Sequence, residues 1–206
     1  MRPILELCST RRRTRSLLIV ITFCLLSQII GTHRSLAQSV SGNSPKYNSS
    51  SAGMNHLILG LDLLAAGTAD DLRYARQNFV FIINMKGEDG LKPAGYLNLG
   101  VVDLMEGNPD AAIKNFLAAI QLNPNYPEAY FNLGGVYYKQ GLLKKAEAAF
   151  LKAIELQADY GRAHYSLGFV YLDLKKYDLA RNHAEKAAEY GVSYRTLKEK
   201  LAKVSR

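Results

Sequence analysis

Residues 130–141 read YFNLGGVYYKQG, and residues 96–107, which stand 34 positions earlier, read YLNLGVVDLMEG. When residues 93–126 are written above residues 127–160, 14 of the 34 positions are identical. Average composition would give roughly two identities over such a length. A third copy at 161–194 keeps the same period, so the main part of the chain is an internal repeat.

Each repeat contains two stretches with the apolar spacing of an amphipathic helix. In the middle repeat these stretches run over about 127–140 and about 143–156, and Gly141 separates them as Gly107 does one repeat earlier. The pattern predicts an all-α fold in which helix-turn-helix units stack along the chain, a short α-solenoid.

Both ends of this array carry less regular helical segments. Residues 54–92 predict a degenerate first repeat, with helices over 54–67 and 72–83 and three extra residues in the turn between them. Residues 195–206 predict a capping helix that would bury the outer face of the last repeat. The apolar face expected for that helix consists of Leu197, Leu201 and Val204.

The repeat over 93–194 resembles the tetratricopeptide repeat in its period and in the placement of its small and aromatic residues, such as Ala146, Phe150 and Ala153. The resemblance places Gly134 where the two helices of a unit cross most closely, with Ala146 and Ala153 opposite. This close packing would offset the roughly 1 kcal/mol that a glycine costs inside a helix. Close helix packing does not explain Gly135, because the equivalent positions in the neighbouring repeats hold the larger residues Val101 and Phe169.

In that family the first helix of each pair lines a concave groove that holds a peptide, so the resemblance implies a protein or peptide ligand. The lining residues it implies are Leu97, Asn98, Val101, Phe131, Asn132, Gly135, Tyr138, Tyr165 and Phe169. We expect Gly135 to leave a notch for one apolar side chain of the ligand. Asn98 and Asn132 either hydrogen-bond the ligand backbone or are simply common in that column of the family.

The N-terminal region predicts export. Residues 1–37 combine an arginine-rich flank, a run of 16 mostly apolar residues at 16–31, and the small-residue site Ser35-Leu36-Ala37, which together are typical of a cleaved secretory signal. The alternative is an uncleaved membrane anchor through 16–31, although that run is shorter than the roughly 17–25 residues of a spanning helix. Residues 38–53, rich in Ser, Gly and Asn, predict a flexible linker. The expected location is therefore periplasmic or secreted.

Charge and composition exclude several functions. Residues 1–37 contain six arginines and one acid, which account for most of the formal net charge of +8. The rest of the chain is therefore nearly neutral and has no excess positive charge that would attract nucleic acid. Cys8 and Cys24 lie in the same segment, which leaves the later chain without a thiol. His56 and His164 share the column of an aromatic packing residue, which favours packing over metal binding. We expect no catalytic residues, no metal and no cofactor.

These features predict a non-enzymatic interaction module that holds a protein segment during envelope assembly or secretion. Two alternatives stay open: a self-assembling scaffold, and a regulatory subunit that recruits a separate enzyme. The sequence does not decide the oligomeric state.

Overall fold

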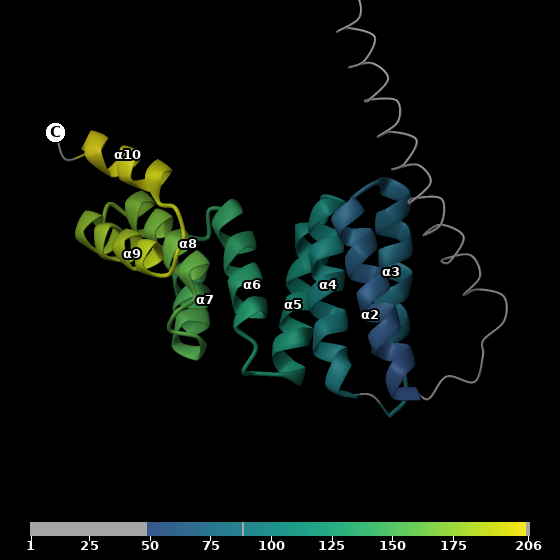
Figure 1. The fold of residues 1–206 in the computed structure, drawn as a ribbon. Helices are drawn as coiled ribbons and strands as arrows, with labels where there is room; N and C mark the ends of the chain where they lie inside the picture. The colour runs from purple at the N-terminus through teal and green to yellow at the C-terminus, as the bar shows by residue number, and fades with distance from the viewer. Residues whose placement is uncertain (1–48, 88, 205–206) are drawn as a thin grey trace, which may run out of the picture. The chain divides into compact units, whose positions relative to one another are not determined.

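The computed structural model describes residues 49–87 and 89–204, and all secondary structure within these ranges is helical. Successive helices form pairs joined by short turns (Figure 1). The pairs are α2 (Ser49–Ala66) with α3 (Ala69–Asn84), α4 (Lys92–Met105) with α5 (Pro109–Leu122), α6 (Pro127–Lys139) with α7 (Leu143–Leu156), and α8 (Gly161–Asp173) with α9 (Tyr177–Glu189). A single 3-10 turn, η1 (Asp89–Leu91), precedes α4, and α10 (Arg195–Val204) follows the last pair.

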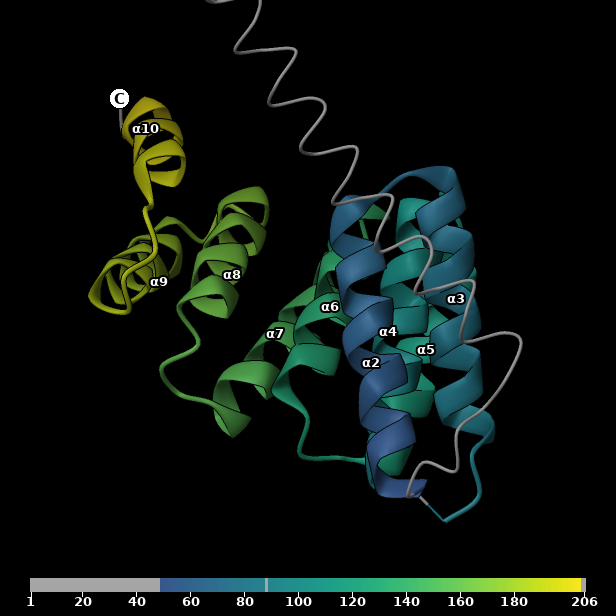
Figure 2. The same ribbon diagram turned by 45° about the vertical axis from the view of Figure 1, so that its right-hand side comes forward.

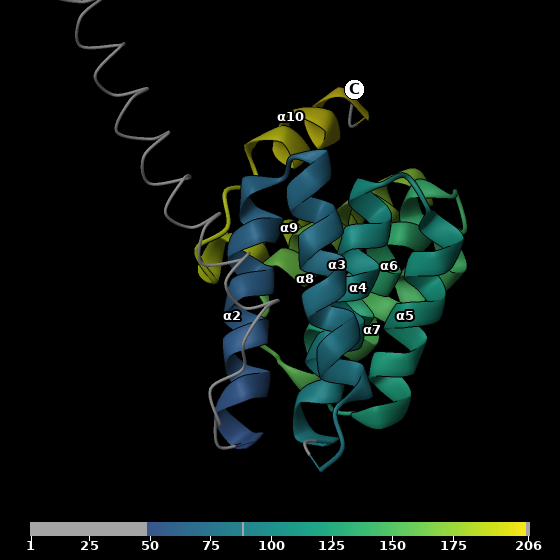
Figure 3. The same ribbon diagram turned by 90° about the vertical axis from the view of Figure 1, so that its right-hand side faces the viewer.

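Each pair packs on the next. The first helices of the first two pairs, α2 and α4, lie side by side (Figure 2). In the view of Figure 3, α2 and α3 stand in front of the later pairs. This arrangement confirms the predicted all-α stack of helix-turn-helix repeats, with boundaries in the middle repeat that agree with those expected from the sequence.

The predicted linker is wrong at its C-terminal end, because α2 begins at Ser49 and residues 49–53 are helical. Ala52 favours a helix, and Gly53 is buried within it, so this turn is held by packing. The predictions for residues 1–48, including signal, anchor and the start of the linker, lie outside the described residues.

The turns inside the pairs depend on a left-handed backbone residue. Gly67, Gly107 and Gly141 have φ of 72°, 81° and 73° in the first three pairs. The fourth pair has Lys175 at the equivalent position, with φ of 59°. Glycine adopts this conformation without steric cost, whereas a residue with a Cβ does not.

The core repeats one contact between a glycine and a phenylalanine ring. Phe79, Phe116 and Phe150 are fully buried, each on the second helix of its pair. A Cβ added to the facing Gly60, Gly100 or Gly134 would lie 2.6, 2.5 or 2.8 Å from the ring of that phenylalanine. The sequence correctly predicted close packing at Gly134, but the nearest atoms belong to Phe150 and not to the alanines on either side of it.

The last pair achieves the same packing with a residue from outside the pair. Ala184 stands where Phe116 and Phe150 stand, and a Cβ on Gly168 would instead lie 2.5 Å from Leu197 Cδ2 of α10. Leu197 and Leu201 are buried, which confirms their part of the capping face. Val204 is 43% exposed, so its predicted place in that face is wrong. It lies in the final turn of α10 near the start of α9, where its side chain is only partly covered.

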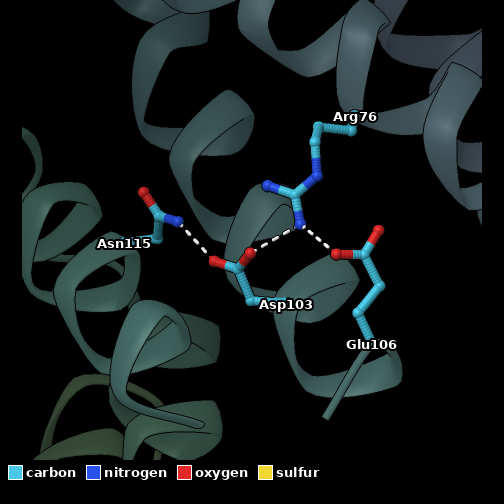
Figure 4. A network of polar contacts seen from close by, with 4 residues as sticks. All are labelled: Arg76, Asp103, Glu106 and Asn115. Carbon is cyan, nitrogen blue, oxygen red and sulfur yellow. Dashed lines mark hydrogen bonds and ion pairs between the residues drawn. The ribbon is translucent and has the colours of Figure 1, made fainter. Parts of the chain in front are cut away.

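A polar cluster joins the first two pairs (Figure 4). The buried carboxylate of Asp103, on α4, accepts hydrogen bonds of 2.6 Å from Arg76 Nη2 of α3 and from Asn115 Nδ2 of α5. Arg76 also donates to Glu106 at 2.6 Å. Both oxygens of Asp103 are therefore satisfied, which allows a carboxylate where the next repeat has Tyr137.

Candidate functional site

The residues predicted to line a groove lie on α4, α6 and α8, the first helices of three consecutive pairs. We call the surface that they form the first-helix face. Its aromatic members are partly buried and pack against the core: Phe131, Tyr138, Tyr165 and Phe169. Val101 packs in the same way against the cluster around Phe116.

The two adjacent glycines of α6 have opposite surroundings. A Cβ added to Gly134 would lie 2.8 Å from the Phe150 ring, whereas a Cβ added to Gly135 would meet nothing within 4 Å. Phe131 and Tyr138 stand four residues before and three residues after Gly135, so their side chains share its side of the helix. Gly135 therefore leaves open space between two aromatic residues.

Aromatic contacts hold the walls of this opening. The Phe131 ring lies 5.8 Å from Phe150 and 5.1 Å from Tyr160, measured between ring centroids. On α8, Tyr165 and Phe169 meet edge to face at 5.0 Å. Such contacts restrict the rings, which makes this part of the first-helix face a fixed surface.

A hydrogen bond ties α6 to α8 beside the opening. The hydroxyl of Tyr138 donates to Asp173 Oδ2 at 2.6 Å. Burial raises the pKa of Tyr138, and the bond to the Asp173 carboxylate raises it further because both favour the protonated phenol. The phenol of Tyr138 is therefore protonated, and able to donate to Asp173, throughout the physiological pH range.

The geometry of paired helices with a fixed 34-residue spacing agrees with three matches to family models. A model described as TPR repeat matches residues 104–141, and models described as tetratricopeptide repeat match 127–160 and 161–190. Residues 104–190 of the chain are tetratricopeptide repeats.

Solved structures show the same fold. The structure of MamA is 26% identical with a TM-score of 0.59, over 83% of this chain and 87% of that chain. Pseudomonas aeruginosa pilF is 22% identical with a TM-score of 0.65, over 75% and 68%. The first TPR domain of Spaghetti (RPAP3), bound to an HSP90 peptide, is 22% identical with a TM-score of 0.53, over 55% and 90%. No curated protein matches the chain.

Leu97 and Asn98, which were expected to line the groove, instead make contacts within the protein. Leu97 is 8% exposed and packs with Phe116 and Leu133, so its prediction as an exposed lining residue is wrong. Asn98 Nδ2 donates to the carbonyl of Ala94 at 2.8 Å, one turn back in its own helix. Asn132 is half-buried on the next repeat and shows no side-chain hydrogen bond to another described residue.

The first-helix face extends beyond the predicted residues at both ends of the tetratricopeptide array. Ile58 and Leu61 of α2 hold the positions of Asn98 and Val101 relative to the repeat glycine, and both are exposed. Arg162 lies over the Phe131 ring and Lys200 over the Phe169 ring, at 4.9 and 5.2 Å from the centroids. Aligning Gly60 with the repeat glycines Gly100 and Gly134 would have predicted the α2 residues of this face. No sequence pattern predicts that Lys200 of α10 contacts α8.

His56 and His164 contact aromatic rings, in agreement with the packing role predicted for these two residues, and His183 stacks on His164. His164 is buried, and its Nδ1 lies 2.9 Å from His183 Nδ1 while its Nε2 contacts the Ala158 carbonyl at 3.1 Å. His56 bonds Asn78 Oδ1 at 2.7 Å. In the described ranges no three His, Cys, Asp or Glu residues come together as a metal site.

None of the helices over 49–87 and 89–204 has the length and apolar character that a membrane span requires.

Proposed function

We propose that this protein is a non-catalytic binding protein that holds a segment of a partner protein against its first-helix face. The observation that carries the proposal is the open space at Gly135, where the fold itself does not require a glycine. Tetratricopeptide repeats generally mediate protein–protein interaction. The peptide bound to the RPAP3 domain supports a segment as the form of the ligand here.

We propose further that the protein works after export, at the cell envelope, during assembly or secretion. The basic flank, apolar run and small-residue site of residues 1–37 support this location. N-terminal sequencing of exported material is expected to begin at Gln38. A full-length species extracted only by detergent would favour the anchored alternative.

Site-specific photocrosslinking tests the binding proposal. A photoreactive amino acid placed at Lys139, which is exposed one turn after Gly135 on the same side of α6, is expected to capture a partner in the native envelope. The matched control carries the same group at Leu151, which is 42% exposed on the second helix of the same repeat. Crosslinks of equal yield at the two positions would contradict binding at the first-helix face.

A further inference from the structure

Helix α2 carries an exposed apolar stripe. Met54, Ile58 and Leu61 are 46%, 53% and 42% exposed. Their spacing of four and three residues puts them on one side of the helix. Ile58 and Leu61 stand two residues before and one residue after Gly60, as Asn98 and Val101 stand around Gly100. The stripe therefore extends the first-helix face by one repeat.

Met105 continues this stripe onto α4. Its side chain is 48% exposed, and its Cε would lie 3.5 Å from a Cβ on Gly67, at the end of α2. The two helices lie side by side (Figure 2). Asp62 is the single charged residue of α2. Asp62 follows Ile58 by one turn and lies beside the stripe, and Asn98 of α4 belongs to the same face. The part of the face formed by α2 and α4 is thus mainly apolar.

The other end of the face presents cations. Arg162 of α8 and Lys200 of α10 lie over the rings of Phe131 and Phe169. Within residues 49–87 and 89–204, neither cation has a carboxylate within ion-pair distance. Asp173, the acid on the same side of α8, accepts the Tyr138 hydroxyl. Ring contacts hold these cations in place while their N–H groups remain available to an acidic ligand.

The size of the apolar stripe favours a peptide segment over a folded copy of the chain. The stripe on α2 runs from Met54 to Leu61, which is about 8 residues or ~12 Å along a helix ~10 Å wide. Its footprint is on the order of 100 Å², well below the ~800 Å² per partner of a stable protein interface.

We propose that the ligand is a segment with apolar side chains at one end and acidic side chains at the other. The apolar end lies over α2 and α4, the acidic end over Arg162 and Lys200, and the opening at Gly135 lies between them. This inference rests on the proposed function and adds the chemistry and direction of the ligand. The acids are side chains along the segment, so a free C-terminal carboxylate is not required.

Two labelled synthetic peptides of 18 residues, both C-terminally amidated, test the chemistry by fluorescence anisotropy. Each has Leu, Phe and Ala in its first half; the second half alternates Glu and Ser in one peptide and Lys and Ser in the other. The Glu peptide is expected to bind about tenfold more tightly at low salt, and added salt is expected to remove the difference. Equal affinities, or tighter binding of the Lys peptide, would overturn the proposal.

Paired variants test the two ends separately. Arg162→Glu with Lys200→Glu is expected to abolish the preference for the Glu peptide. The control, Lys86→Glu with Lys114→Glu, makes the same charge change at exposed sites away from the face and is expected to keep it. Ile58→Asn with Leu61→Asn is expected to weaken both peptides, whereas Leu117→Asn with Leu151→Asn, exposed leucines of second helices, is not. Circular dichroism melts confirm that each variant is folded.

The outcomes separate this inference from the proposed function. If photocrosslinking at position 139 captures a partner and both end variants bind it normally, the direction and chemistry are wrong although the function stands. If sedimentation shows a dimer that Ile58→Asn with Leu61→Asn dissociates, the stripe is an interface between copies and the proposal is overturned. If crosslinking at position 139 yields no more than at Leu151, the proposed function itself fails.

Discussion

Leu197 of α10 packs directly on Gly168 of α8, so closely that a Cβ on the glycine would lie 2.5 Å from Leu197 Cδ2. In the two preceding repeats a phenylalanine ring from the second helix makes this contact, and here Ala184 leaves the space to α10. The C-terminal helix therefore completes the core of the last repeat, in addition to covering its outer face.

Leu197→Ala is expected to destabilise the protein by about 2–5 kcal/mol, the usual cost of such a truncation in a core. Val204→Ala, in the exposed last turn of the same helix, is expected to cost less than about 0.5 kcal/mol. Adding Ala184→Phe to Leu197→Ala is expected to recover part of the loss, because it restores the ring of the other repeats. Urea unfolding of the three variants measures this, and similar losses for Leu197 and Val204 would show that α10 does not complete the core.

The adjacent glycines of α6 are expected to respond oppositely to the same substitution. Gly134→Leu would force its side chain into the Phe150 ring and destabilise the protein by about 1–3 kcal/mol or more. Gly135→Leu meets open space and gains up to about 1 kcal/mol of helix propensity. Thermal melting distinguishes them, and destabilisation of both to a similar degree would mean that Gly135 is also a packing residue.

Phe150→Ala is expected to cost about 3–5 kcal/mol, since its ring is fully buried and fills the space beside Gly134. Leu151→Ala, the exposed neighbour, serves as the control. A loss below about 1 kcal/mol for Phe150→Ala in denaturant melts would contradict the packing described for the middle repeat.

Lys175 adopts a left-handed conformation at the turn where the two preceding repeats have glycine. Lys175→Gly is expected to stabilise the protein by about 0.5–1 kcal/mol, because relief of this strain outweighs the added freedom of the unfolded chain. The reciprocal change, Gly141→Lys, is expected to destabilise by about 1–2 kcal/mol. Unfolding midpoints in urea test the pair, and a loss of stability in Lys175→Gly would show that its side chain matters more than its backbone.

The contact between His164 and His183 predicts loss of stability in acid. Burial lowers the pKa of both, and for His183, which also faces His164 and Lys186, the pKa falls to about 4. Between that value and the unfolded value near 6.5 the unfolded chain binds more protons. Stability is therefore expected to be full above about pH 7 and to fall as the pH drops through this window.

The slope of this loss should not exceed about 1.4 kcal/mol per pH unit for each histidine. His183→Asn, which keeps an N–H donor near His164 but cannot titrate, is expected to show a flatter profile. Chemical denaturation at pH 5 and pH 7.5 provides the comparison. Identical profiles for the two proteins would remove His183 as a cause of the acid sensitivity.

The sequence predicted the repeat, its helices and the different surroundings of Gly134 and Gly135, because identical residues at a fixed spacing must occupy equivalent positions. It could not predict that Leu197 replaces a phenylalanine, or that Lys200 lies over Phe169. Both contacts depend on how α10 turns back, and α10 has no counterpart in the repeats. Leu97 was wrongly predicted to line the groove, because its position in the aligned repeats does not show how deeply a neighbouring helix buries its side chain. The start of α2 was missed because a serine-rich composition gives no sign of packing.

The binding claim is tested most directly by the affinity of Gly135→Leu for the partner segment that photocrosslinking at position 139 identifies. The account predicts that this variant melts at or above the temperature of the wild type and binds the segment at least about tenfold more weakly. Unchanged affinity in the folded variant would contradict the account, because the open space beside Phe131 and Tyr138 would then have no part in binding.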